Sequence, residues 1–123
     1  MADLEGRSAG LIAWQWALYP GGHTTRANLL IHIVAVPLFW LGTLGLIGSA
    51  IEGSWLMAIV APVLMVVSMV LQGRGHAMEE NPPVPFSSAA NAISRIFLEQ
   101  WVNFPRFVLS GAWLRALLQR TPS

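Results

Sequence analysis

Two long apolar stretches, separated by only three residues, constrain the fold of this chain more than any other feature. They cover residues 26–51 and 55–78, and each is free of charge through its central part. A helix rises about 1.5 Å per residue, so each stretch can cross roughly 30 Å of hydrocarbon. Because the connection of Glu52, Gly53 and Ser54 is so short, the two helices must be antiparallel neighbours. The sequence therefore predicts an all-α integral membrane protein built on a helical hairpin.

Composition and charge agree with a membrane location. Hydrophobic residues make up 54% of the 123 residues and charged residues only 11%, more apolar surface than a small soluble domain can bury. The seven basic residues are all arginines and are scattered, which gives no footprint for nucleic acid. None lies in the hairpin turn, so the positive-inside rule predicts both termini in the cytoplasm, at the inner membrane of a bacterium or the endoplasmic reticulum of a eukaryote. The acidic residues Asp3 and Glu5 argue against a signal peptide.

Shorter helices are expected on both sides of the hairpin, giving one membrane domain. Residues 9–19 predict an interfacial helix, with Trp14 and Trp16 at the depth of the lipid headgroups. Three prolines within residues 81–88 predict a loop, after which Ser87 or Ser88 can cap a helix. Residues 88–119 are interpreted as amphipathic helices that are interfacial or packed on the hairpin, with Arg95 and Glu99 on their polar side. A further crossing is the less favoured alternative.

The chemistry is expected where ionisable side chains approach lipid, because such groups are costly there and usually functional. Asn28 and His32 lie four residues apart on the first long helix, and His76 and Glu80 repeat that spacing on the second. A spacing of four places both side chains on one helix face. In an antiparallel hairpin, the start of the first helix and the end of the second meet on the same side. The sequence therefore predicts that the two pairs converge.

Two histidines and a carboxylate, with coordination positions left open, match a non-haem Fe(II) site that activates oxygen. Zinc would also accept this set, and the absence of cysteine excludes thiolate ligands. Asn28 and Gln72 could orient the ligands by hydrogen bonds from outside the coordination sphere. Glu79 is interpreted as an ordinary solvated charge.

His23 is a further ligand on one condition. It precedes His32 by nine residues, which on a continuous helix would separate the two by roughly 13 Å. Pro20, Gly21 and Gly22 argue that the helix begins later, with Thr24 or Thr25 as its cap. His23 can then fold back from a loop towards the same metal.

The ordered set of these residues resembles a known family. Tyr19, His23, Asn28, His32 and Pro37, followed by Gln72, Gly75, His76, Glu80 and Pro82, resemble the 2-hydroxy fatty acid dioxygenase family, named for metabolism of phytosphingosine to odd-numbered fatty acids. The resemblance covers roughly residues 15 to 115, and the tail looks like that of the small bacterial members. It implies an Fe(2+)-dependent α-oxidation that shortens a 2-hydroxy fatty acid by one carbon, with His23, His32, His76 and Glu80 as catalytic metal ligands.

The expected partners follow from that reading. They are membrane lipid, the 2-hydroxy fatty acid and dioxygen, with a protein partner or a second copy of the chain in addition. The substrate's carboxylate and hydroxyl would chelate the iron while its acyl chain lies along the hairpin, and Arg26 or Arg74 would pair with the carboxylate as it approaches. Two alternatives remain open. One is a non-enzymatic membrane subunit whose polar face binds a larger complex, and the other is a haem or quinone site at His32 and His76.

Overall fold

The residues that the structure describes fold entirely into helices and their connections. The computed structural model describes residues 10–119. In chain order its elements are α2 (Leu11–Leu18), the 3₁₀ turn η1 (Pro20–Gly22), α3 (Arg26–Glu52), α4 (Trp55–His76), α5 (Ala89–Leu98), the π-helical segment η2 (Glu99–Asn103), α6 (Phe104–Leu109) and α7 (Ala112–Leu118). The expected all-α class is confirmed.

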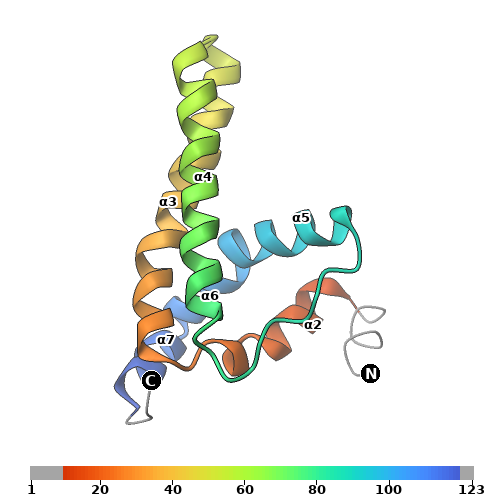
Figure 1. Cartoon of the computed structure of the whole chain (residues 1–123), viewed down its shortest axis with the longest axis vertical. Coiled ribbons are helices and arrows are strands. Elements are labelled where there is room, and N and C mark those ends of the chain that lie inside the picture. The colour runs from red at the N-terminus through yellow and green to blue at the C-terminus, as the bar shows by residue number, and fades with distance from the viewer. Residues whose placement is uncertain (1–9, 120–123) are drawn as a thin grey trace.

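Helices α3 and α4 form the antiparallel hairpin, which is the tall element of Figure 1. Gly53 closes the turn with φ 71, a left-handed conformation that glycine adopts without strain. Ser54 then begins α4, and its side-chain oxygen accepts a hydrogen bond from the backbone N–H of Met57. Both helices are long and apolar enough to cross a membrane.

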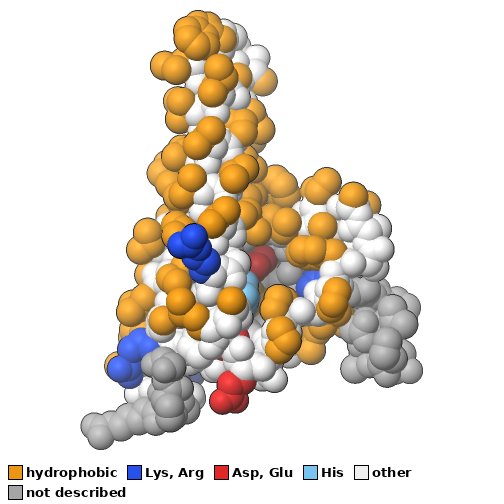
Figure 2. All heavy atoms as spheres, in the orientation of Figure 1, with side chains coloured by type: hydrophobic (Ala, Val, Ile, Leu, Met, Phe, Trp, Pro, Cys, Tyr) orange, Lys and Arg blue, Asp and Glu red, His pale blue; other side chains and the backbone are white. Residues whose placement is uncertain are grey.

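The hairpin packs closely along its inner faces. A Cβ atom on Gly42 would lie only 2.8 Å from the carbonyl oxygen of Ala61, so the absence of a side chain lets the two backbones approach. Farther from the turn, the hydroxyl of Ser68 donates a hydrogen bond to the carbonyl of Ala35. Only 28% and 17% of the most apolar windows of α3 and α4 are buried, so large apolar side chains face outward over the hairpin (Figure 2). The hairpin is thus not the covered core of a soluble fold.

Helices α6 and α7 pack against the lower part of α3. Their buried contact is made by aromatic and aliphatic side chains, and the indole N–H of Trp113 donates to the carbonyl of Leu29 at 3.0 Å. The core consists of Tyr19, Leu29, Val36, Phe104 and Phe107. With six and seven residues, α6 and α7 are too short to span a membrane, so the described residues form no further crossing.

Helices α2 and α5 project sideways from the base of the hairpin (Figure 1), and we call them the side module. The side-chain amide of Gln15 joins them by donating to the carbonyl of Arg95 at 2.9 Å. Ser88 caps α5 as expected, accepting a bond from the N–H of Asn91. One expectation is wrong here. Arg95 does not lie on an exposed polar side but is buried, with its guanidinium 5.1 Å from the centroid of the Trp14 ring, which is buried as well.

Candidate metal site

Four side chains meet where the side module joins the base of the hairpin. They are His23, His32, His76 and Glu99, and one ligand atom from each lies within 4.8 Å of the others. Each comes from a different segment of the chain. His23 follows η1, His32 lies in α3, His76 ends α4 and Glu99 begins η2. The group could hold a metal ion.

The three histidines converge as the sequence predicted. The antiparallel hairpin brings the rings of His32 and His76 to a centroid distance of 4.8 Å. The ring of His23 lies 4.9 Å from that of His32 and 4.8 Å from that of His76. Helix α3 begins only at Arg26 with Thr25 as its N-cap, so His23 lies outside the helix and reaches back from the η1 turn. That prediction is confirmed.

Glu99 is positioned by the π-helical segment that follows α5. A π turn closes a wider ring than an α turn, and such turns recur at functional sites. The next residue, Gln100, is fully buried and exchanges two hydrogen bonds with Gln72 of α4, at 2.8 and 2.9 Å. This reciprocal amide pair fixes η2 against α4 at the residue adjacent to Glu99.

All three imidazoles face the same carboxylate oxygen. The Nε2 atoms of His23, His32 and His76 lie 3.2, 3.5 and 3.7 Å from Oε2 of Glu99. Ligands about 2.1 Å from a metal are separated by about 3.0 Å along an octahedral edge and about 3.4 Å along a tetrahedral one. The three separations from Glu99 are close to these values, and all four ligand atoms lie within 4.8 Å of one another, so the side chains would draw together around a shared ion.

Backbone carbonyls fix the tautomers of two of these rings. Nδ1 of His23 lies 2.8 Å from the carbonyl of Tyr19, and Nδ1 of His32 lies 3.0 Å from the carbonyl of Asn28. A carbonyl only accepts hydrogen bonds, so in the neutral rings the proton is on Nδ1 and the Nε2 lone pair points at Glu99. This is the arrangement by which proteins orient metal-binding histidines.

The protonation states also suit a cation. Burial on its own raises the pKa of Glu99, but hydrogen bonds donated by the three imidazoles, which require rings protonated at Nε2, outweigh it and hold that pKa well below its ordinary value. Burial lowers the pKa of His23 and so favours its neutral form, although Glu99 acts in the opposite direction. A metal cation would take the place of the Nε2 protons, since it requires an ionised carboxylate and imidazoles with a free Nε2 lone pair.

An aromatic wall closes the group on one side. The ring of Tyr19 stacks on that of His23 at 3.8 Å, and Phe107 meets Tyr19 edge to face at 5.1 Å. Burial first, and then the nearby Glu99 carboxylate, raise the pKa of Tyr19 well above its ordinary value, so its phenol stays protonated. The site is therefore shielded from water by rings on the side of α6.

Glu80 does not join the group, so the expected geometry is wrong at this residue. Helix α4 ends at His76, and the four-residue spacing that would align Glu80 with it no longer applies. Glu80 is exposed. The carboxylate of the group is Glu99, which would lie on the polar face of an uninterrupted α-helix but begins the π-helical segment instead.

Glu79 is also unlike its predicted role as a solvated charge. It is 8% exposed, and it accepts hydrogen bonds from the backbone N–H groups of Thr24 and Thr25 and from the amide of Asn28. Burial alone would raise the pKa of Glu79, but these bonds lower it below its ordinary value. Glu79 thus ties the end of α4 to the segment that carries His23.

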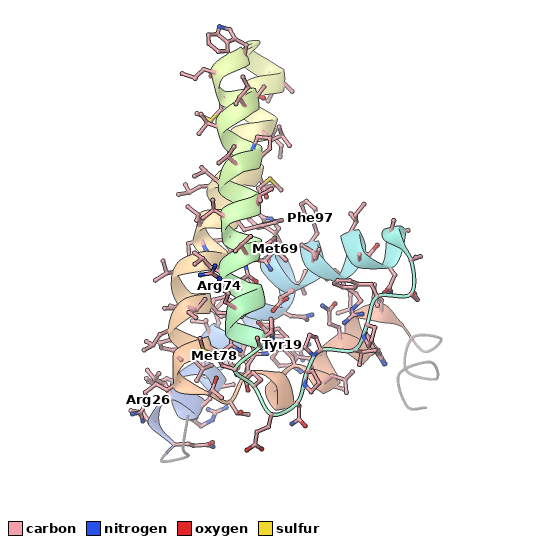
Figure 3. All side chains as sticks on the ribbon, in the orientation of Figure 1. Tyr19, Arg26, Met69, Arg74, Met78 and Phe97 are labelled. Carbon is pink, nitrogen blue, oxygen red and sulfur yellow. The ribbon has the colours of Figure 1, made fainter. Side chains whose placement is uncertain are left out.

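The residues expected around the ligands have indirect roles. The side chain of Asn28 donates to Glu79 and to the carbonyl of Gly22, one residue before His23. Gln72 acts through its pair with Gln100. Arg26 is exposed and donates to the carbonyl of Leu117, and Arg74 is exposed on α4; Figure 3 shows both away from Tyr19. Neither arginine lies at the group.

No protein-family model, curated protein or solved structure matches this chain.

Proposed function

We propose that the protein is a membrane-embedded, Fe(II)-dependent dioxygenase that shortens 2-hydroxy fatty acids by one carbon. One observation carries the proposal. The Nε2 atoms of three histidines lie 3.2, 3.5 and 3.7 Å from a single, partly buried carboxylate oxygen. Nitrogen and carboxylate donors of this kind suit Fe(II), and the resemblance of the histidine blocks to the dioxygenase family supports iron over zinc.

Membrane insertion supports a lipid-derived substrate. The outward faces of α3 and α4 are apolar, whereas Arg26 and Arg74 lie towards the base of the hairpin. With the base on the cytoplasmic side, the metal group lies close to the membrane interface, where the carboxylate of a fatty acid resides. An enzyme placed there can meet a fatty acid without extracting it from the bilayer.

The reaction balances with dioxygen alone. A 2-hydroxy acid, R–CH(OH)–COOH, and O₂ give R–COOH, CO₂ and H₂O. The bond between the carboxyl carbon and carbon 2 breaks, and the oxidation of those two carbons supplies the four electrons that reduce O₂. No further reductant is needed. Bound iron would activate dioxygen so that it can react with the closed-shell acid.

The residues of the chain define how reactants can be placed. His23, His32, His76 and Glu99 would hold the iron, and the bound iron would supply the redox chemistry that couples oxidation of the acid to reduction of dioxygen. Phe104 and Phe107, both fully buried, keep bulk water from the side of His32 and Tyr19.

The test is metal content and turnover in one preparation. Protein purified without oxygen should carry about one Fe(II) per chain. Given O₂ and a 2-hydroxy fatty acid, it should release the acid one carbon shorter, with equal amounts of O₂ consumed and CO₂ formed. The variant His76→Ala should lose both metal and turnover, and Glu80→Ala, at an exposed position, should keep both. Wild-type protein that cannot be loaded with iron, or full turnover by His76→Ala, would favour the non-enzymatic membrane subunit.

A further inference from the structure

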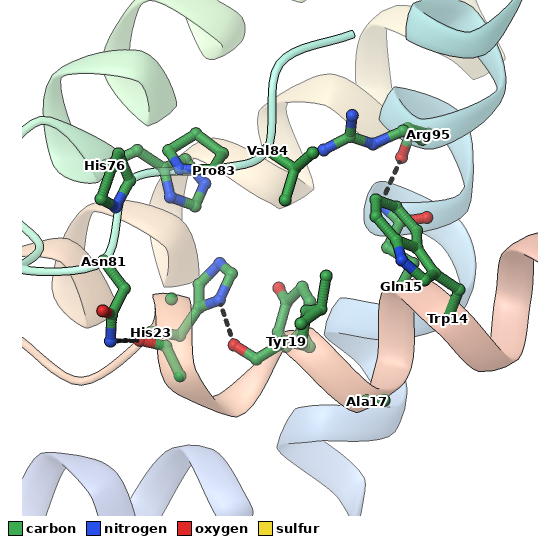
Figure 4. A pocket seen from close by; sticks show the side chains of 14 residues that line it. Trp14, Gln15, Ala17, Tyr19, His23, His76, Asn81, Pro83, Val84 and Arg95 are labelled. Carbon is green, nitrogen blue, oxygen red and sulfur yellow. Dashed lines mark hydrogen bonds between the residues drawn. The ribbon is translucent and has the colours of Figure 1, made fainter. Parts of the chain in front are cut away.

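A cavity of about 380 Å³ adjoins the metal group. Figure 4 shows His23 and His76 at one end of it and Trp14, Gln15 and Arg95 at the other. Its size lies at the lower end of the range for ligand pockets. The walls come from α2 and η1, from residues 81–84 after the hairpin, and from one residue of α5.

The cavity meets the metal group on one side only. His23 and His76 line it, whereas His32 and Glu99 do not. His32 is fully buried, so it lies on the side of the group that faces the protein interior. A molecule in the cavity would therefore reach the open side of a metal held by these four residues.

Most of the lining is hydrocarbon. The amide N–H groups of two polar lining residues are bonded to the protein's own backbone, Gln15 to the carbonyl of Arg95 and Asn81 to the carbonyl of Gly21. At the far end the guanidinium of Arg95 lies over the Trp14 ring and donates to the carbonyl of Pro85. The remaining walls are mainly Trp14, Ala17, Leu18, Tyr19, Pro82, Pro83 and Val84. Such a surface suits alkyl carbons next to a reacting head group.

A second hollow, on the hairpin, lacks this connection. It has a volume of about 410 Å³ and lies between α3, α4 and α5; Met69 and Phe97, two of its lining residues, are labelled in Figure 3. None of the four metal-group residues lines it. The walls of this hollow therefore offer no direct contact with the metal group.

We propose that the cavity between α2 and residues 81–84 holds the carbons of the 2-hydroxy fatty acid that follow its reacting end. This inference rests on the proposed function for the identity of the ligand. It replaces the expectation that the acyl chain lies along the hairpin. Because the cavity is small, it holds only the first part of a long chain, and its walls select for the shape of that part.

Photochemical labelling tests this directly. The probe is a 2-hydroxy fatty acid with a diazirine a few carbons from the carboxylate, added to zinc-loaded protein in lipid nanodiscs so that no turnover occurs. Peptides containing Trp14–Tyr19 and residues 81–84 should carry most of the label, and excess unlabelled 2-hydroxy acid should remove it. Label concentrated on Met65–Val70 would overturn the proposal.

Two tryptophan substitutions provide a matched pair. Val84→Trp should fill the cavity and reduce the competed labelling at least tenfold, with metal content and helicity unchanged. Val66→Trp, in the second hollow on the hairpin, should leave the competed labelling unchanged. If Val84→Trp disturbs the fold, Ala17→Phe fills the same cavity from α2. The reverse pattern, loss with Val66→Trp and none with either cavity variant, would overturn the proposal.

The result is distinguishable from failure of the proposed function. Labelling needs neither iron nor oxygen, so cavity labelling without any turnover by the iron-loaded protein would reject the dioxygenase and retain the binding site. Turnover accompanied by labelling of the hairpin would retain the dioxygenase and reject the cavity as the site of the acyl carbons.

Discussion

At the scale of single residues, two adjacent glutamates after α4 have opposite environments. Glu80 is exposed, whereas Glu79 is buried and accepts hydrogen bonds from Thr24, Thr25 and Asn28. Through these bonds Glu79 holds the residues that follow His23 against the end of the helix that carries His76. Its carboxylate lies outside the metal group, but it fixes the relative position of His23 and His76.

Replacing Glu79 should therefore weaken both the fold and the site. Glu79→Ala leaves buried donors without an acceptor, which costs about 1–3 kcal/mol. We expect a lower melting temperature and weaker metal binding, measured by thermal unfolding and by titration with Co(II). Glu80→Ala is the matched control and should resemble the wild type. Equal behaviour of the two variants would contradict this role.

The contribution of Glu79 should depend on pH in a defined direction. Its hydrogen bonds lower its pKa in the folded protein, so the stabilisation is fully present above the unfolded pKa of about 4.3. It is lost as the pH falls through the lower folded pKa. The difference in stability between wild type and Glu79→Gln should thus be largest near neutral pH and should shrink below about pH 4.

The histidines of the site could be predicted from the sequence, and its carboxylate could not. Polar residues are rare in the hairpin, so His32 and His76 stood out, and the glycines before His23 showed that it could fold back. Glu99 lies in a segment with many polar residues, where one more charge carries no signal. The buried pairing of Gln100 with Gln72 and the π turn bring it inward. Neither feature has a pattern that a single sequence reveals.

At the scale of secondary structure, the long helices follow from local chemistry and the side module does not. Hydropathy and the Gly53 turn define α3 and α4, and Ser88 defines the start of α5. Contact between α2 and α5 depends on Gln15 and Arg95, which are 80 residues apart. Such contacts depend on the tertiary fold and leave no mark in local periodicity.

The amide pair between α4 and η2 should be essential for the position of Glu99. Gln100→Leu leaves the amide of Gln72 buried with one of its two partners lost, at a cost of about 1–3 kcal/mol, and should weaken Co(II) binding. In the double variant Gln72→Leu, Gln100→Leu the unfolding cost should be smaller than the sum of the two single costs. Metal binding should stay weak, because the amide pair no longer holds η2 against α4. Additive costs, measured by denaturant unfolding, would show that the pair is not coupled.

At the scale of the whole molecule, the chain separates an apolar shaft from a polar base. Large exposed side chains cover α3 and α4 towards the turn, and the metal group, the cavity and the side module lie at the opposite end (Figure 1, Figure 2). Burying the shaft in lipid removes its apolar surface from water and brings the base to the interface. The metal group is then positioned at the interface by the same hairpin that supplies two of its histidines.

This arrangement predicts that the turn and the base lie on opposite sides of the membrane. The chain has no cysteine, so single cysteines can be introduced at two exposed positions, Glu52→Cys in the turn and Glu80→Cys at the base. In right-side-out vesicles, a membrane-impermeant maleimide should label Glu52→Cys and reach Glu80→Cys only after the vesicles are opened. The arginines outside the turn favour this orientation by the positive-inside rule. Labelling of both cysteines from the outside would show that the hairpin does not span the bilayer, whereas protection of Glu52→Cys alone would reverse the orientation.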